Sequence, residues 1–377
     1  MNWPTQKLEN VADFCLGKML DQKKNRGEPL PYLANVNVRW GEFDLADLRE
    51  MRFEQHELDR YGLKYGDIVM CEGGEPGRCA IWKEQCSNMM IQKALHRIRP
   101  HDCLQPDFLY YFFLYKGRAG HLAPLFTGST IKHLPREKLA LVEVPVPPHT
   151  TQNQIASVLS TYDNLIKNNR RRIQLLEQAA RLLYKEWFVH LRFPGHEHVK
   201  IKDGVPEGWE KKPLGELLTL QRGFDLPVSK RKEGHIPIYA STGINGYHVE
   251  AKVSGPGVVT GRSGSLGKVM YITGDFWPLN TTLWVKEFKL IKPLFATYLL
   301  KSMQLEQFNG GAAVPTLNRN DVHRVEVLCP SRMLLDLFEE YVGDIMSQID
   351  TLRKASSKLA NARDVLLPRL MKGEVTV

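Results

Sequence analysis

Residues 151–188 read TQNQIASVLSTYDNLIKNNRRRIQLLEQAARLLYKEWF, and this stretch determines the architecture of the chain. Apolar residues recur in it at alternating steps of four and three, from Ile155 to Trp187. Such a heptad seam predicts a long helix with an apolar partner along its length. The partner pattern lies in the same chain, because most seam positions are matched by an apolar residue 183 positions later, as Ile155 is by Phe338.

We therefore predict two long helices that pair in antiparallel order as a coiled coil. A coiled coil between two chains, and burial as ordinary core helices, are the alternatives. The predicted seam consists of Ile155, Leu159, Tyr162, Ile166, Ile173, Leu176 and Leu183 in the first helix, and of Phe338, Val342, Ile345, Ile349, Leu352, Leu359 and Leu366 in the second. Thr151 and Gln154 form a capping-box pattern that predicts where the first helix begins.

The segments that precede the two helices also resemble each other. Trp3 and Leu8 open the first segment with the same spacing as Trp209 and Leu214 open the second. Near the middle of each segment, a Gly-rich turn lies between two short apolar runs and ends on a cation, Arg78 or Lys268. This pattern predicts a β-hairpin with a basic tip in both copies.

Each segment closes on a shared tail, at 128–134 in the first copy and 311–317 in the second. The predicted fold class is α+β, with two mixed α/β heads, two long helices and a pseudo-twofold internal repeat. The predicted domains are a first head at 1–147, a first helix at 148–190, a linker at 191–208, a second head at 209–330 and a second helix at 331–377.

Composition narrows the function classes. The 377 residues carry a formal net charge of +9, which favours a polyanionic partner. The six cysteines have no metal-ligand spacing, and we interpret them as reduced thiols. No run of 18 apolar residues and no signal-peptide core is present, so we expect a cytoplasmic protein without membrane contact.

The sequence has no recognisable catalytic motif. Residues 261–268 approach a phosphate-binding loop, but the spacing to Gly-Lys is wrong and Val269 replaces the required Ser or Thr. No GxGxxG, HExxH or GxSxG pattern is present, and the acidic residues show no metal-binding cluster. We expect no catalytic residue, no metal site and no cofactor bound by this chain.

In the order of its parts the chain resembles the specificity subunit of a type I restriction–modification system. The resemblance rests on two variable heads with a shared tail, on the heptad helices and their endings at 182–188 and 366–373, and on the entry to the second head at 206–210. It covers essentially the whole chain.

The resemblance implies a division of labour. Each head is then a target-recognition domain that reads half of a bipartite, asymmetric double-stranded DNA sequence. The helices space the heads and dock two modification subunits, which carry S-adenosylmethionine and the adenine-N6 methyltransferase. Restriction subunits add an ATP- and Mg-dependent endonuclease, and this chain is itself a non-catalytic recognition subunit.

Three alternatives remain open at this point. They are a specificity subunit whose partner is a fused nuclease–methyltransferase, a coiled-coil adaptor that binds proteins, and an enzyme with an unrecognised site. The candidate DNA-binding residues are polar side chains that differ between the heads, or that belong to the hairpin tips and shared tails. They are Lys18, Gln22, Lys23, Asn35, Asn37, Arg78, Thr130 and Lys132 in the first head, and Arg222, Ser241, Thr242, Asn245, Arg262, Ser263, Lys268, Thr316 and Arg319 in the second.

Overall fold

The computed structural model of the chain describes residues 3–21, 25–311 and 313–375. These residues form two compact units, one of Met1–Asn169 with Ala355–Val377 and one of Arg170–Lys354. The boundary between the units crosses both long helices, so each unit contains one head and the adjoining part of each helix. The compact units therefore differ from the predicted division into heads and separate helices.

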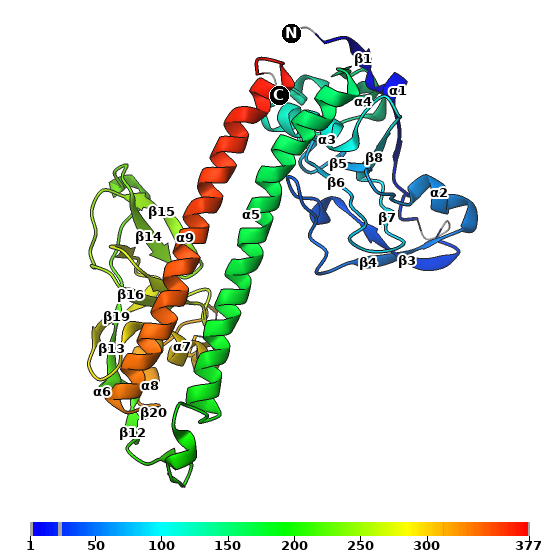
Figure 1. The fold of residues 1–377 in the computed structure, drawn as a ribbon. Helices are drawn as coiled ribbons and strands as arrows, with labels where there is room; N and C mark the ends of the chain where they lie inside the picture. The colour runs from blue at the N-terminus through cyan, green and yellow to red at the C-terminus, as the bar shows by residue number, and fades with distance from the viewer. Residues whose placement is uncertain (1–2, 22–24, 312, 376–377) are drawn as a thin grey trace. The chain divides into compact units, whose positions relative to one another are not determined.

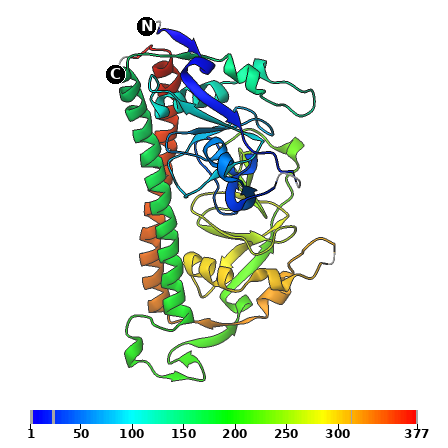
Figure 2. The same ribbon diagram turned by 90° about the vertical axis from the view of Figure 1, so that its right-hand side faces the viewer.

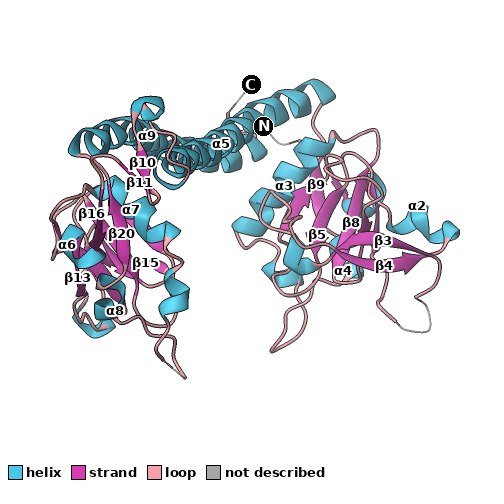
Figure 3. Cartoon of the chain, turned by 90° about the horizontal axis from the view of Figure 1, so that it is seen from below, coloured by secondary structure: helices cyan, strands magenta, loops and turns pink. Residues whose placement is uncertain are grey.

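The first unit contains three small sheets (Figure 3). Strand β1 (Thr5–Lys7) pairs with β9 (Glu143–Pro145). The four-stranded sheet has the order β2 (Ala12–Leu16), β8 (Leu95–Pro100), β5 (Ile68–Cys71) and β6 (Cys79–Ile81). The three-stranded sheet has the order β4 (Arg49–Phe53), β3 (Glu28–Leu33) and β7 (Met90–Ile91).

The second unit repeats this topology. Strand β12 (Glu210–Pro213) pairs with β20 (Glu326–Cys329). The four-stranded sheet has the order β13 (Leu218–Arg222), β19 (Thr282–Phe288), β16 (Gly257–Gly261) and β17 (Val269–Ile272). The three-stranded sheet has the order β15 (Gly243–His248), β14 (Ile236–Ala240) and β18 (Trp277–Pro278). A small hairpin of β10 (Ile201–Lys202) and β11 (Val205–Pro206) precedes these sheets.

The internal repeat extends to close backbone contacts. After β2 and after β13, the chain passes against the three-stranded sheet at a glycine. A Cβ atom on Gly17 would lie 2.4 Å from the Ile91 carbonyl oxygen, and one on Gly223 would lie 2.2 Å from that of Leu279. Both positions require glycine because any side chain would displace backbone. Both predicted hairpins, β5–β6 and β16–β17, are confirmed, and the two heads share one strand topology.

The heads differ in their connections. Strands β3 and β4 are joined by the long loop 34–48, which includes the short helix η1 (Asn35–Asn37), whereas β14 and β15 are joined by Ser241 and Thr242 alone. The first head also carries η2 (Gln55–Glu57) and α2 (Leu58–Tyr61), and no helix in the described part of the second head corresponds to them. The extra length of the first head lies in these insertions.

The two long helices are α5 (His149–Tyr184), which continues as the π-helical segment η4 (Lys185–Val189), and α9 (Arg332–Met371). The predicted capping box at Thr151 is wrong, because α5 begins two residues earlier, at His149. The Gln152 side chain lies inside the first turn and donates to the carbonyl oxygens of Cys103 at 3.0 Å and Pro147 at 2.8 Å. It joins the helix start to the head.

In each unit the two helices lie side by side and run in opposite directions (Figures 1 and 2). In the first unit Asp163 of α5 pairs with Arg363 of α9. In the second unit Glu177 of α5 pairs with Arg353 of α9 at 2.7 Å, and Trp187 of η4 contacts Phe338, which lies earlier in α9. The predicted seam residues are all buried or half-buried.

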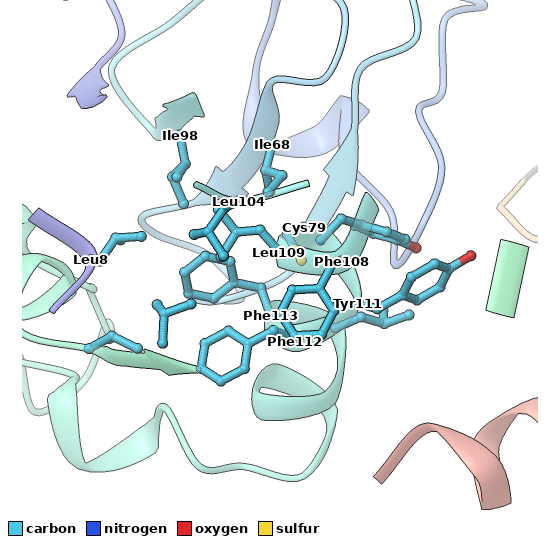
Figure 4. Packing of buried hydrophobic residues seen from close by; sticks show 14 of the residues in the cluster. Leu8, Ile68, Cys79, Ile98, Leu104, Phe108, Leu109, Tyr111, Phe112 and Phe113 are labelled. Carbon is cyan, nitrogen blue, oxygen red and sulfur yellow. The ribbon is translucent and has the colours of Figure 1, made fainter. Parts of the chain in front are cut away.

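A buried helix connects each head to the long helices. In the first unit this helix is α3 (Pro106–Arg118), in which every residue from Phe108 to Leu114 is buried. The buried residues of α3 belong to one core cluster with residues of β5 and β6 and with Ile155 and Leu159 of α5, and Figure 4 shows part of this cluster. A helix that is apolar on all sides is stable only when covered on all sides.

The corresponding helix of the second unit is α7 (Pro293–Ser302), and its core is aromatic. Phe338 of α9 has no exposed surface and its ring centroid lies 5.0 Å from that of Phe188 and 6.3 Å from that of Phe295. Such ring pairs add to the free energy that area burial alone supplies.

We predict that Phe338→Ala lowers the free energy of unfolding of the second unit by about 3–5 kcal/mol, because it leaves a cavity among these rings. Urea unfolding followed by tryptophan fluorescence measures the change. Met333→Ala is the matched control, since Met333 lies on the same helix with 75% of its surface exposed. Equal unfolding midpoints for the two variants would contradict the assigned core.

Candidate nucleic-acid interface

Seven of the seventeen candidate residues lie in two loops that occur in each unit. The turn loop connects the hairpin strands, at 72–78 in the first unit and 262–268 in the second. The tail loop belongs to the shared tail, at 127–133 in the first unit and at 309–311 with 313–316 in the second. We call the two loops of a unit its loop cluster. Figure 2 shows the first unit's tail region projecting from the sheets.

Isolated β-bridges join the two loops at equivalent places. Gly73 of the first turn loop is bridged to His133, and Ser263 of the second is bridged to Thr316. The tail loops are closed in the same way, by the bridges Thr127–His133 and Asn309–Leu317. The predicted repeat of the tails therefore corresponds to a repeated contact with the hairpin.

The cations at the hairpin tips are bound within the protein. Arg78 donates to the carbonyl oxygen of Asn35 at 2.9 Å and forms a 2.7 Å ion pair with Glu75. Lys268 donates to the carbonyl oxygen of Thr242, in the connection that follows β14. Both cations therefore fasten the turn to the neighbouring three-stranded sheet. The ion pair with Glu75 makes Arg78 a weaker candidate for contact with the DNA backbone, because it neutralises the charge of Arg78.

The backbone of Glu72 is held on both sides in the first unit. Its N–H donates to the carbonyl oxygen of Ala94 at 2.8 Å, and its carbonyl oxygen accepts from the N–H of Leu134 at 2.8 Å. The side-chain carboxylate lies 3.1 Å from Nδ1 of His133 through either oxygen. Glu72 was not among the candidates. Its position beside the Gly-rich turn, which corresponds to that of Arg262 in the second copy, could have identified it.

The backbone of Arg262 makes the equivalent pair of hydrogen bonds in the second unit. We call this pair of hydrogen bonds the backbone frame. Its N–H donates to the carbonyl oxygen of Thr281 at 2.8 Å, and its carbonyl oxygen accepts from the N–H of Leu317 at 2.7 Å. Its guanidinium Nη1 lies 3.3 Å from the carbonyl oxygen of Asn280. The two frames are equivalent, while the side chains that they present, Glu72 and Arg262, differ in charge.

Two candidates serve the fold of the first head instead. Lys18 is 4% exposed, forms an ion pair with Glu57 and donates to the carbonyl oxygen of Arg52 at 2.9 Å. Asn37 is 7% exposed, accepts from the N–H of Ala34 and donates to the carbonyl oxygen of Asp44, each at 3.0 Å. We correct the prediction for both residues, because burial and pairing leave no polar group available to DNA.

The remaining candidates are distributed more widely. Ser241 is buried at 7% exposure, which removes it as a reader of bases, and Gln22 and Lys23 lie outside the described residues. Arg222 pairs with Asp225 at 3.5 Å. The exposed candidates are Thr130, Lys132, Arg222, Thr242, Asn245, Lys268 and Arg319, and the half-buried ones are Asn35, Arg262, Ser263 and Thr316.

Asn245 and Arg319 are among the candidates that lie outside the loop cluster. Asn245 is on β15, where its carbonyl oxygen accepts from Arg231 at 2.6 Å, and Arg319 opens α8 (Arg319–His323). Sequence reasoning missed Arg231, whose long side chain reaches across the β14–β15 hairpin. A contact of this kind has no local sequence signal.

The described part of the chain includes a large cavity but no cluster of candidate metal ligands. Across it, no group of three or more His, Cys, Asp or Glu side chains is placed to hold a metal ion. A cavity of about 1140 Å³ lies within the second unit between α5, β17, α7 and α9. Its acidic Glu177 is paired with Arg353 on its wall. Among the described helices, none has both the length and the apolar character needed to cross a membrane.

Comparison with known proteins agrees with this geometry. The family model described as the type I restriction modification DNA specificity domain matches residues 1–178 and 206–354. The chain therefore belongs to the type I restriction–modification DNA specificity family.

Full-length relatives in this family are specificity subunits. The chain is 24% identical to the type I restriction enzyme MjaIX specificity subunit of Methanocaldococcus jannaschii, over all of this chain and 94% of that protein. It is 20% identical to the HindI specificity subunit of Haemophilus influenzae, over 98% of this chain and all of that protein. The crystal structure of a type I S subunit from M. genitalium has the same fold, with a TM-score of 0.64 at 19% identity over 98% of this chain and 96% of that one.

The loop cluster of the first unit depends on a buried histidine. His96 on β8 is fully buried, and its Nε2 donates to the carbonyl oxygen of Leu134, next to the frame of Glu72. Burial lowers the pKa of His96 below its ordinary value of 6.5. The folded protein therefore binds fewer protons than the unfolded chain below pH 6.5, and stability is lost as pH falls through that window.

We predict that the first unit's unfolding temperature falls between pH 7.5 and pH 5.5 in the wild type and falls less in His96→Leu. Leucine is the natural choice because Leu283 occupies the corresponding place on β19, opposite Thr260 as His96 is opposite Met70. Calorimetry at several pH values measures the difference. The same pH dependence in both proteins would show that another group controls it.

Proposed function

We propose that this chain is the DNA sequence-specificity subunit of a type I restriction–modification complex and recognises a bipartite, asymmetric double-stranded DNA target. The observation that carries the proposal is the repeated backbone frame at Glu72 and Arg262, which presents different side chains in two heads of the same topology. Two heads that share one topology but present different side chains suit a DNA target whose two halves differ in sequence. The net charge of +9 supports a polyanionic partner.

We propose further that α5 and α9 form an antiparallel coiled coil that fixes the separation of the two half-sites. The 36 residues of α5 correspond to about 54 Å at ~1.5 Å per residue. This exceeds the ~34–36 Å of one turn of DNA, so the two heads can contact half-sites separated by an unread spacer. A pseudo-twofold arrangement of the heads about the helices would present similar surfaces to both half-sites.

The proposed protein partners are two modification subunits, together with restriction subunits. Exposed apolar residues on α5 and η4 support docking at the helices, since Leu175, Leu182 and Val189 follow one another at steps of seven and are 47%, 47% and 53% exposed. Exposed apolar patches of this kind mark interaction sites. The chain itself would be non-catalytic, with S-adenosylmethionine, ATP and Mg bound by the partners that carry adenine-N6 methylation and DNA cleavage.

A map of N6-methyladenine in the host genome, with and without the gene for this chain, tests the proposal. We expect one split motif to lose its methylation when the gene is deleted and to regain it when the gene is restored. An unchanged map in cells that express the chain and its modification subunits would contradict the proposal. Duplex binding by the assembled complex that weakens steeply with added salt would support it independently.

A further inference from the structure

The turn loops of the two heads carry opposite charge at a structurally equivalent position. Glu72 and Arg262 each follow the first strand of the hairpin, and each is held by the same pair of backbone hydrogen bonds. The difference extends along the loops. Residues 72–78 contain two carboxylates and one cation, whereas residues 262–268 contain two cations and no carboxylate.

The charge of the first turn loop is unsuitable for phosphate contact. Both of its carboxylates are fixed in place, Glu75 by Arg78 at 2.7 Å and Glu72 by His133 at 3.1 Å. A carboxylate repels the DNA backbone and accepts hydrogen bonds only. Its remaining use at a DNA surface is to accept from a base that offers an amino group.

Glu72 retains the capacity for such a contact. Its side chain is 22% exposed and that of His133 is 45% exposed, so the pair is open on one side. A carboxylate has about four lone-pair sites, and His133 occupies only part of them. The histidine also holds the carboxylate in position, which reduces the side-chain entropy that a base contact would cost.

Arg262 has the complementary chemistry. The guanidinium has five donors, and the 3.3 Å contact with the Asn280 carbonyl oxygen engages one nitrogen. Arginine reads guanine through its O6 and N7 acceptors, and a carboxylate accepts from the N4 amino group of cytosine. Each residue thus matches a different base edge in the major groove.

We propose that Glu72 and Arg262 are specificity-determining residues, with Glu72 reading a cytosine in the half-site of the first head and Arg262 reading a guanine in the half-site of the second. This inference rests on the proposed function. According to this inference, the residue at one repeated position accounts for a difference in sequence between the two halves of the target.

The test uses the full chain assembled with its modification subunits and begins from the methylated motif of the wild type. Glu72→Gln and Arg262→Gln are compared with Glu137→Gln and Arg324→Gln, exposed residues of α4 (Arg136–Ala140) and of the segment after α8. Selection from randomised duplexes is expected to give a changed base at one position of one half for each test variant. The two control variants are expected to retain the wild-type motif.

Modified duplexes test the same contacts without altering the protein. In the first half-site, cytosine is replaced by 2-pyrimidinone, which lacks the amino group, and in the second, guanine is replaced by 7-deazaguanine, which lacks N7. At the read position each replacement should weaken wild-type binding roughly 5- to 150-fold. The first should have little further effect in Glu72→Ala, which removes the acceptor, and the second little further effect in Arg262→Ala, which removes the donors.

The outcomes separate the inference from the proposed function. Absence of any split motif for the wild type would remove both. A split motif that Glu72→Gln and Arg262→Gln leave unchanged, or full binding to every modified duplex, would overturn the inference and leave the function standing. A base change in one half for each variant, with loss of the matching analogue effect, would establish the assignment.

Discussion

The packing of α5 against α9 is the constraint on which the structure of each unit depends. Residues far apart in the sequence come together in this helix pair. The pair covers the buried helix of each head, α3 or α7. In the first unit Asp163 of α5 joins three elements, since it accepts from Tyr111 of α3 at 2.8 Å and pairs with Arg363 of α9. Without the helix pair, part of the apolar stretch from Phe108 to Leu114 in α3 would be exposed to water, which is unfavourable.

In the second unit the long helices also cover the buried helix, but the side-chain contacts between them are different. Tyr298 is the sixth residue of α7, as Tyr111 is of α3, but it stacks on Tyr184 with ring centroids 5.9 Å apart instead of bonding to a carboxylate. The topology is repeated while the contacts are replaced. The same rule holds at the loop clusters, where the backbone frame is constant and Glu72 and Arg262 differ.

Periodicity and repetition made the architecture predictable from the sequence. The heptad steps identified both long helices, and the Gly-rich turns identified both hairpins, because each pattern is local and each occurs twice. Side-chain roles were less predictable. Lys18 and Asn37 are polar, yet they are buried by the insertions that distinguish the first head, and nothing adjacent in the sequence reveals Glu57 or Asp44 as partners.

Charge also misled the selection of candidates. The candidates were cations and neutral polar residues, so Glu72 was left out, and Arg78 was chosen although a carboxylate three residues away neutralises it. Contacts within the fold decide which charges are free, and some of them, such as that between Arg78 and the carbonyl oxygen of Asn35, join residues far apart in the sequence. The corresponding positions become evident only when the hydrogen bonds of both heads are compared.

The central claim is that the paired helices set the distance between two separate DNA readers. The most direct test is the length of the unread spacer in the methylated motif, measured for the wild type and for a chain with four residues duplicated in each helix, after Asn169 and after Lys354. Four helical residues add about 6 Å, comparable with one to two base-pair steps. The account predicts a longer spacer with both half-sites unchanged, and an unchanged spacer in a methylating complex would contradict it.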